Sequence, residues 1–203
     1  MDINSRAYWE DKFASGRWKQ LHCHHYNIDF YRYAVELMPW WLVEEIRNEA
    51  MHICDLCSAE GHGLPVLRAA FAHNPLTGMD YAANAIAHAR AQFPDYTFIV
   101  DDLMHTSRQY DVVFCSNTLE HFADYKAVMR KMAGMAKRYL LLLVPFEEAK
   151  LAGEHVVLFG SESFPHTLNG CSLVFNAMTD TTLYAEQQLW TGRQMLLVYQ
   201  RQE

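Results

Sequence analysis

Acidic residues stand at the ends of three consecutive apolar runs. Asp55 follows "HIC", Asp80 follows "LTGM", and the pair Asp101-Asp102 follows "YTFIV". Parallel strands of an open α/β sheet present their carboxyl ends at one edge, so these carboxylates are expected to share a crevice. Acids in that position can accept hydrogen bonds from ribose hydroxyls. Each aspartate alone is equally well read as a turn or cap residue, but three in register favour a nucleotide-like ligand.

The turn after the first of these acids is poor in glycine. Cys57, Ala59 and Gly61 occupy its alternate positions. Glycine reaches positive φ and lets a ligand approach the backbone, whereas a side chain in the left-handed conformation costs on the order of 1–2 kcal/mol. Cysteine and alanine are small replacements. We therefore predict that the turn still forms and binds its ligand with altered affinity; loss of binding is the alternative.

Two histidines follow the later apolar runs and are candidates for proton transfer. His121 lies in "LEHF" and His155 in "GEHVVLF". Histidine is the natural general base near neutral pH, and Glu120 can orient an imidazole or meet a substrate amine. We predict catalytic roles for Glu120, His121 and His155, with a purely structural His121 as the alternative.

Alternating apolar and amphipathic runs indicate the βαβ units that position these residues. We predict one α/β domain over residues 51–203, preceded by a helical cap over 1–50. Strands are expected at 51–56, 75–80, 96–100, 110–115, 139–144, 171–177 and 194–199, and helices at 5–13, 29–50, 64–72, 82–93 and near 125–136. The last two strands, joined by a polar link, predict an antiparallel addition to the sheet.

The segments "HICDLCSAEG", "LTGMDYAANAIAHAR", "IVDDL", "YDVVFCSNTLEHF" and "LLLLVPFEE" resemble class I S-adenosylmethionine-dependent methyltransferases. The resemblance implies a Rossmann-like, mostly parallel sheet of seven strands, the last antiparallel, with helices on both faces. It implies that the cofactor is S-adenosylmethionine. The residues implied to bind it are Asp55, Cys57, Ala59 and Gly61 at the methionine part, Asp80 and Tyr81 near the ribose, Asp102 and Leu103 at the adenine, and Asn117 and Thr118, with Ser116, at the methyl-donor side.

"YWEDKFASGRW" near the start and "LWTGRQMLLVYQ" near the end resemble members of this family, of the type 11/12 kind, that accompany glycan and natural-product biosynthesis. The first segment implies an arm that covers cofactor and substrate. The resemblance thus implies methyl transfer to a small-molecule or sugar acceptor, expected at oxygen. A catalytically inactive scaffold is the alternative. A nicotinamide-dependent oxidoreductase is disfavoured because the chain lacks GxGxxG.

Metal binding is not expected. Small-RNA 2'-O-methyltransferases bind a metal through Glu-x-x-Glu-His together with later histidines. The matching stretch here, which ends at Glu120-His121, begins with the amide of Asn117 in place of the first carboxylate. Hard divalent cations prefer anionic oxygen. The run from His22 to His25 is crowded into one short loop, where it cannot easily surround an ion, and the Cys54/Cys57 pair has no second pair nearby.

The composition also limits the kinds of partner that the protein is expected to bind. The formal charge of −7 disfavours nucleic acid, because neutralising phosphates needs a surplus of Lys and Arg. The longest apolar run, 139–146, is far shorter than the roughly 20 residues of a membrane-spanning helix. The start of the chain does not read as an export signal, and the five scattered cysteines fit reduced thiols. A cytoplasmic protein without a membrane partner is expected; the oligomeric state is not predicted.

Overall fold

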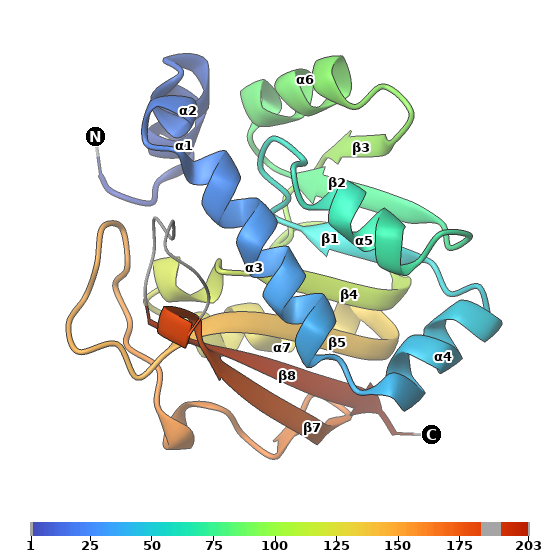
Figure 1. Ribbon diagram of the computed structural model, residues 1–203. Helices are drawn as coiled ribbons and strands as arrows, with labels where there is room; N and C mark the ends of the chain where they lie inside the picture. Colours follow the sequence, from blue (N-terminus) through green and yellow to red (C-terminus); the bar gives the residue numbers. More distant parts are fainter. Residues whose placement is uncertain (1, 184–191, 203) are drawn as a thin grey trace.

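The computed structural model describes residues 2–183 and 192–202. One sheet of eight strands forms the centre of the molecule (Figure 1), in the order β3-β2-β1-β4-β5-β8-β7-β6. Strands β1 to β5 run parallel, and β8 pairs antiparallel with both β5 and β7. The strands are β1 (Ile53–Leu56), β2 (Leu76–Asp80), β3 (Thr97–Val100), β4 (Tyr110–Ser116), β5 (Ala136–Phe146), β6 (Thr167–Leu168), β7 (Cys171–Asp180) and β8 (Arg193–Arg201).

The predicted mostly parallel sheet with an antiparallel last strand is confirmed, but the described residues form eight strands and not seven. The additional strand is β6, whose two residues pair with the start of β7. The turn between them is Asn169-Gly170, and both residues have positive φ, 46° and 78°. Asn-Gly favours such tight hairpins. Two residues are too few to show a periodic pattern, so only the turn signalled the strand.

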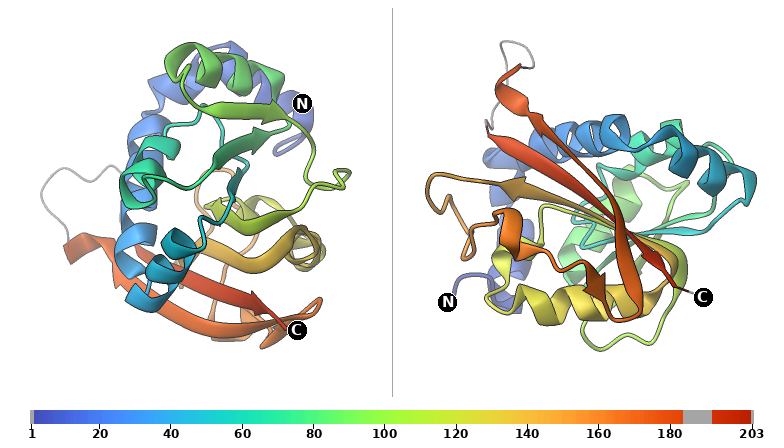
Figure 2. Two further views of the ribbon diagram at one scale, coloured as in Figure 1. Left: turned by 90° about the vertical axis from the view of Figure 1, so that its right-hand side faces the viewer. Right: turned by 90° about the horizontal axis from the view of Figure 1, so that it is seen from below.

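Helices cover both faces of the sheet, as predicted. Figure 2 shows α3, α4 and α5 on one side and α7 on the other. The α-helices are α1 (Arg6–Ala14), α2 (Arg17–Gln20), α3 (Cys23–Leu37), α4 (Trp40–Asn48), α5 (Leu64–Ala70), α6 (Ala83–Gln92) and α7 (Tyr125–Met135), and the short 3-10 helices are η1 (Leu119–His121), η2 (Ser161–Ser163) and η3 (Thr181–Leu183).

The alternation of side chains along β5 builds an apolar core on each face. Leu140 and Leu142 pack in one cluster with Met132 of α7, whereas Leu141 packs in the other with Tyr31 of α3. Successive residues of a strand point to opposite faces, so an unbroken apolar run is the pattern of a strand that is covered on both sides. This burial fixes the positions of the strand ends that carry the site.

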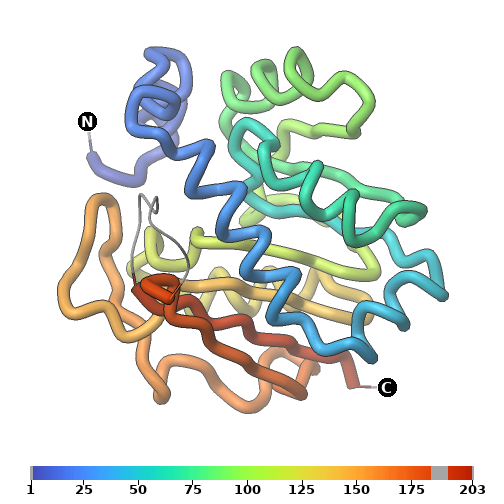
Figure 3. The backbone as a smooth tube through the Cα atoms, in the orientation of Figure 1, coloured from blue at the N-terminus to red at the C-terminus, as the bar shows by residue number. Residues whose placement is uncertain are grey.

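The first helices lie over the carboxyl end of the sheet. Figure 3 shows the start of the chain close to the segment that follows β5, and the side-chain amide Nδ2 of Asn4 donates a hydrogen bond to the carbonyl oxygen of Glu154 at 2.7 Å. The histidine run lies partly in a helix, because α3 begins at Cys23 with His22 in a left-handed conformation. The interpretation of this run as a loop was therefore wrong. The middle of the predicted polar link between the last two strands, residues 184–191, lies outside the described residues.

Within the described ranges, none of the helices combines the length and the apolar character that crossing a bilayer requires.

Candidate functional site

The glycine-poor turn after β1 keeps the backbone that glycine usually provides. Cys57, Ala59 and Gly61 have φ of 57°, 49° and 78°, all in the left-handed region that side chains seldom adopt. A Cβ on Gly61 would lie 2.5 Å from the ring of Phe98, so this position accepts only glycine. The small residues at the other two positions therefore bear strain in an intact turn.

Asp80, at the end of β2, holds that turn from the neighbouring strand. Its Oδ2 accepts the backbone N–H of Ala59 at 3.0 Å, and its Oδ1 accepts that of Ala82 at 2.8 Å, just before α6. Burial raises the pKa of Asp80 to about 6, while these backbone donors oppose the shift. The carboxylate is thus ionised at neutral pH and joins the first turn to α6.

Asp55 lies behind the turn and not on the pocket surface. The side chain is buried, and its Oδ1 accepts the hydroxyl of Tyr31 at 2.6 Å. Burial raises the pKa of Asp55 to about 8, although the Tyr31 hydrogen bond lowers it. Sequence patterns did not indicate Tyr31, since nothing in α3 marks it as the partner of a strand-end acid.

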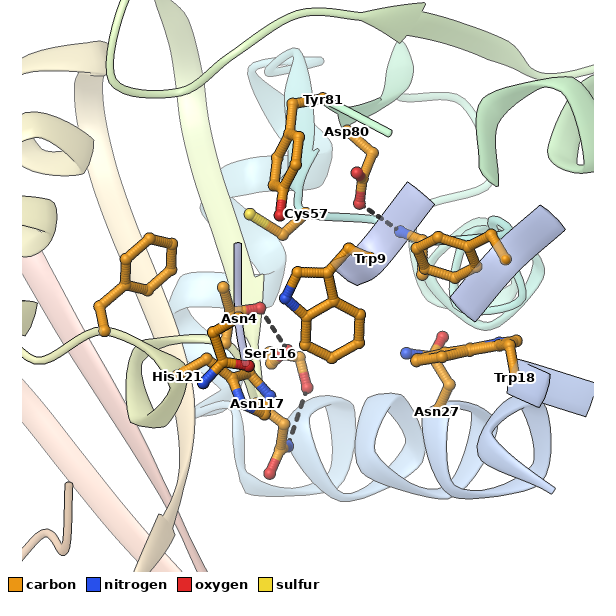
Figure 4. Close-up of a pocket in the computed structure, with 14 residues that line it drawn as sticks. Asn4, Trp9, Trp18, Asn27, Cys57, Asp80, Tyr81, Ser116, Asn117 and His121 are labelled. Atoms are coloured by element: carbon orange, nitrogen blue, oxygen red, sulfur yellow. Dashed lines mark hydrogen bonds between the residues drawn. The ribbon is translucent and has the colours of Figure 1, made fainter. Parts of the chain in front are cut away.

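A cavity of about 90 Å³ lies between this turn and the N-terminal helices (Figure 4). The indole of Trp9 lies among the side chains that line it. Eight of the predicted site residues line the cavity, namely Cys57, Ala59, Asp80, Tyr81, Ser116, Asn117, Thr118 and His121, and they are joined by Asn4, Trp9, Phe13, Trp18, Asn27 and Phe122. The carboxyl ends of three neighbouring strands and the arm thus meet at one site.

Asp102 and Leu103 are not among the lining residues. The carboxylate of Asp102 accepts the backbone N–H of Met104 at 2.9 Å and lies 3.1 Å from Nδ1 of His105. These contacts stabilise the loop that contains Asp102. Leu103 is buried in the core. Their adenine-binding role remains a prediction.

Asn117 is fixed by a residue at the other end of the chain. Its side-chain amide exchanges two hydrogen bonds with that of Gln194 on β8, at 3.2 and 3.1 Å, and Gln194 is fully buried. Asn117 itself has a φ of 47°. The amide pair locks the left-handed residue that opens the segment after β4, and no sequence signal marked Gln194.

Several polar atoms around the cavity lack a partner. Asn4 Oδ1, Trp18 Nε1 and Asn27 Oδ1 are buried, and no hydrogen-bond partner is found for them among the described residues. All three residues line the cavity. A buried polar atom without a partner costs about 1–3 kcal/mol. The lining is therefore suited to a ligand with both donors and acceptors.

The arm is held from both sides of the site. Glu10 accepts the backbone N–H groups of Ala83 and Asn84 at 2.8 and 3.1 Å, which caps α6. On the opposite side, Glu154 accepts Lys12 Nζ at 2.6 Å and the Tyr8 hydroxyl at 2.7 Å. A carboxylate at the start of a helix and a buried ion pair are both stabilising. These contacts hold α1 across the carboxyl ends of the strands.

The three predicted catalytic residues are brought together beside a second cavity of about 330 Å³. Nε2 of His155 lies 3.9 Å from Oε1 of Glu120. The rings of His121 and His155 are 5.4 Å apart. Burial raises the pKa of Glu120 to about 8 and lowers that of His121 to about 4, so His121 is neutral at physiological pH and can accept a proton or donate a lone pair.

Residues 23–173 match the methyltransferase domain family. The chain is 24% identical to the trans-aconitate 2-methyltransferase of Escherichia coli O1:K1 / APEC over 136 residues, which make up 66% of this chain and 52% of that protein. It thus spans about half the length of the curated relatives it matches.

Among solved structures, the magnesium protoporphyrin IX methyltransferase ChlM from Synechocystis PCC 6803 with bound SAH superposes with a TM-score of 0.70 at 17% identity, covering 98% of this chain and 100% of that one. A chain from the complex between the Haloferax volcanii Trm112 methyltransferase activator and a methyltransferase gives 0.69 at 16% identity, with 96% and 98% covered.

The sheet order, the antiparallel last strand and the turn held by a strand-end aspartate define a Rossmann-like fold of the class I S-adenosylmethionine-dependent methyltransferase type. With three quarters of the chain matched, the protein belongs to the methyltransferase domain family. The resemblance seen in the sequence is confirmed at the level of family and fold.

Proposed function

We propose that the protein is an S-adenosylmethionine-dependent methyltransferase that methylates an oxygen atom of a small-molecule or sugar acceptor. The observation that carries the proposal is the hydrogen bond from the Ala59 backbone to Asp80. It holds the turn in a left-handed conformation although two of its glycine positions carry side chains. A site that no longer bound a cofactor would not be expected to keep both the strained backbone at Cys57 and Ala59 and the Asp80 carboxylate that holds it.

The donor set supports this cofactor. Asp80 retains free lone pairs on both oxygens for hydroxyl groups, and Asn4, Trp18 and Asn27 present unpartnered polar atoms. When bound, S-adenosylmethionine supplies a sulfonium methyl group, whose C–S bond breaks as the new O–C bond forms. The cavity of about 90 Å³ is smaller than the roughly 300–1,000 Å³ usual for ligand pockets. We therefore expect the side chains of the arm to shift when the cofactor enters.

The acceptor side lies at Glu120, His121 and His155. The Nδ1 atoms of both histidines are engaged, with the Glu154 carbonyl at 3.1 Å and the Glu148 carboxylate at 2.9 Å. Each Nε2 is thus available to take the proton of an acceptor hydroxyl. The adjoining cavity of about 330 Å³, bounded by the arm, suits a small acceptor better than a polymer.

Calorimetry with S-adenosylhomocysteine is the test of cofactor binding. We expect a dissociation constant in the micromolar range and a rise in the melting temperature. Neither heat nor a thermal shift with this ligand or with S-adenosylmethionine would overturn the proposal in favour of an inactive scaffold.

Turnover is then tested by S-adenosylhomocysteine release with a panel of hydroxyl, carboxylate and amine acceptors. Trans-aconitate, the acceptor in the name of the curated relatives, comes first, followed by simple sugars and phenols. Methylation at nitrogen in preference to oxygen, read by mass spectrometry of the product, would contradict the oxygen acceptor.

A further inference from the structure

Glu120, His121 and His155 form a cluster that the backbone holds in place. One potential ligand atom of each lies within 4.8 Å of the others. Glu120 and His121 are consecutive in η1, and the backbone N–H of Val156 donates to the carbonyl oxygen of Glu120 at 2.8 Å. This bond fixes the loop after β5 against η1, so His155 is positioned by main-chain contacts.

Both histidines have one ring nitrogen engaged and the other free. His121 Nδ1 lies 3.1 Å from the carbonyl oxygen of Glu154, which can only accept, so His121 carries its proton on Nδ1. His155 Nδ1 likewise lies 2.9 Å from a carboxylate oxygen of Glu148. Each Nε2 therefore presents a lone pair. Metal-ligating histidines show this arrangement, in which a carbonyl or carboxylate fixes the tautomer and orients the ring.

The acid group of Glu120 is buried without a hydrogen-bond partner among the described residues. Its side chain is 1% exposed, and neither carboxylate oxygen has a hydrogen-bond partner in the part of the chain that the structure describes. The 3.9 Å to Nε2 of His155 is too long for a hydrogen bond. A buried carboxylate without a partner is costly. A cation between Glu120 and the two imidazoles would satisfy all three groups.

The cluster has an entry path and room for a further ligand. Glu120, His121 and His155 all line the cavity of about 330 Å³, and His121 also lines the cofactor pocket. Lys12 lines the same cavity, and its charge is balanced by Glu154, with Nζ 2.6 Å from Oε1. A ligand bound here would lie between the cofactor pocket and the acceptor cavity.

We propose that Glu120, His121 and His155 bind a divalent transition-metal cation such as Zn²⁺, with an open coordination position that faces the acceptor cavity. Two imidazoles and one carboxylate make up the set of protein ligands found in catalytic zinc sites, and they disfavour Mg²⁺ and Ca²⁺, which prefer oxygen. Zinc lies about 2.0–2.2 Å from its nitrogen and oxygen ligands, so the three ligand atoms must move closer to one another. Small changes in the side-chain torsion angles achieve this.

The sequence favoured no metal because Asn117 replaces a carboxylate. In the structure the amide of Asn117 is bound to Gln194, and the third ligand comes from His155 instead. The role of the cation rests on the proposed function: the open position takes an oxygen of the acceptor. A metal-bound hydroxyl has a lowered pKa, so its proton leaves to solvent water. With the cation bound, both Nε2 atoms are ligands, and the role as bases proposed for them above applies to the metal-free protein alone.

Cobalt titration of the full chain tests the site. After treatment with EDTA and its removal, we expect one Co²⁺ per chain with visible d–d absorption, and competition by Zn²⁺ but not by Mg²⁺. His121→Gln, His155→Gln and Glu120→Gln should each weaken binding at least tenfold. Because the buried carboxyl group of Glu120 has no hydrogen-bond partner among the described residues, Glu120→Gln should keep or raise the melting temperature of the metal-free protein, which separates lost binding from lost folding.

Two control variants locate the metal. His24→Gln/His25→Gln alters the other histidine cluster and His105→Gln an exposed histidine, and both should bind Co²⁺ as the wild type does. Absence of stoichiometric Co²⁺ binding, or wild-type affinity in His121→Gln/His155→Gln, would overturn the metal site. S-adenosylhomocysteine binding is measured on the same metal-free samples, so a failed metal site and a failed cofactor site give different results.

Discussion

The backbone N–H of Ala59 donates a hydrogen bond to Oδ2 of Asp80 at 3.0 Å, and this contact joins the turn after β1 to the end of β2. Asp80→Asn replaces one acceptor oxygen by an N–H₂ group, which would face a backbone donor. Hydrogen bonds to charged groups contribute about 1.5–3 kcal/mol. We expect a loss of stability of about 2 kcal/mol and at least tenfold weaker S-adenosylhomocysteine binding, measured by urea denaturation and calorimetry.

Asp95→Asn is the matched control, because Asp95 is an exposed aspartate before β3. It removes the same charge without touching the turn and should leave both quantities unchanged. Equal effects of the two substitutions would show that net charge, and not the turn, controls cofactor affinity.

The strain at Ala59 can be measured against a second buried alanine. Ala59 has a φ of 49°, whereas Ala82 has a φ of −78°. At both positions, substitution by glycine removes one buried methyl group and increases the conformational entropy of the unfolded chain. Only at position 59 does it also relieve the strain of a side chain on a left-handed backbone. Ala59→Gly should therefore be less destabilising than Ala82→Gly by about 1–2 kcal/mol. Equal losses in urea denaturation would mean that the turn is unstrained.

The sequence predicted what depends on local patterns. The apolar run of β5 and the strand-end acids Asp55 and Asp80 lie where their periodicity and position indicated. Parallel strands buried on both faces leave a clear pattern because every side chain is apolar. The seven anticipated strands were therefore found, and only the two-residue β6, signalled by a turn alone, was missed.

The contacts that shape the site have no such pattern. Gln194 pairs with Asn117 across 77 residues, and Glu10 caps α6 from 74 residues away. A lone polar residue in a strand or on a helix face gives no sign of which distant group it will meet. The third member of the cluster, His155, was predicted by type, but its contact with Glu120 is created by the loop that Val156 fixes.

Trp9 provides a direct readout of ligand entry. Its indole lines the cofactor cavity and lies 5.2 Å from the ring of His121. Because the cavity is smaller than the cofactor requires, binding must change the surroundings of this indole. We expect S-adenosylhomocysteine to alter the tryptophan fluorescence of the wild type. Trp18 lines the same cavity, so Trp9→Phe/Trp18→Phe should lose most of this change, whereas Trp40→Phe, at a residue 78% exposed, should retain it. An unchanged response in Trp9→Phe/Trp18→Phe would place the ligand elsewhere.

The buried acid behind the turn predicts a pH dependence of stability. Burial raises the pKa of Asp55 from 3.8 to about 8, and the charge of Asp80 acts in the same direction while the hydroxyl of Tyr31 opposes it. The folded protein thus binds a proton that the unfolded chain releases near pH 4. By linkage, the stability contributed by this proton is fully present below pH 4 and is lost as the pH rises to about 8.

Asp55→Asn tests this relation, since asparagine stays neutral and its oxygen can still accept the Tyr31 hydroxyl. The free energy of unfolding, measured in urea between pH 4 and pH 8, should fall less steeply in the variant, by up to about 1.4 kcal/mol per pH unit. The variant should match the wild type near pH 4 and exceed it near pH 8. The remaining slope includes Asp80, whose pKa is raised to about 6, and Glu120, whose pKa is raised to about 8. Parallel profiles for the two proteins would show that Asp55 is ionised in the folded state.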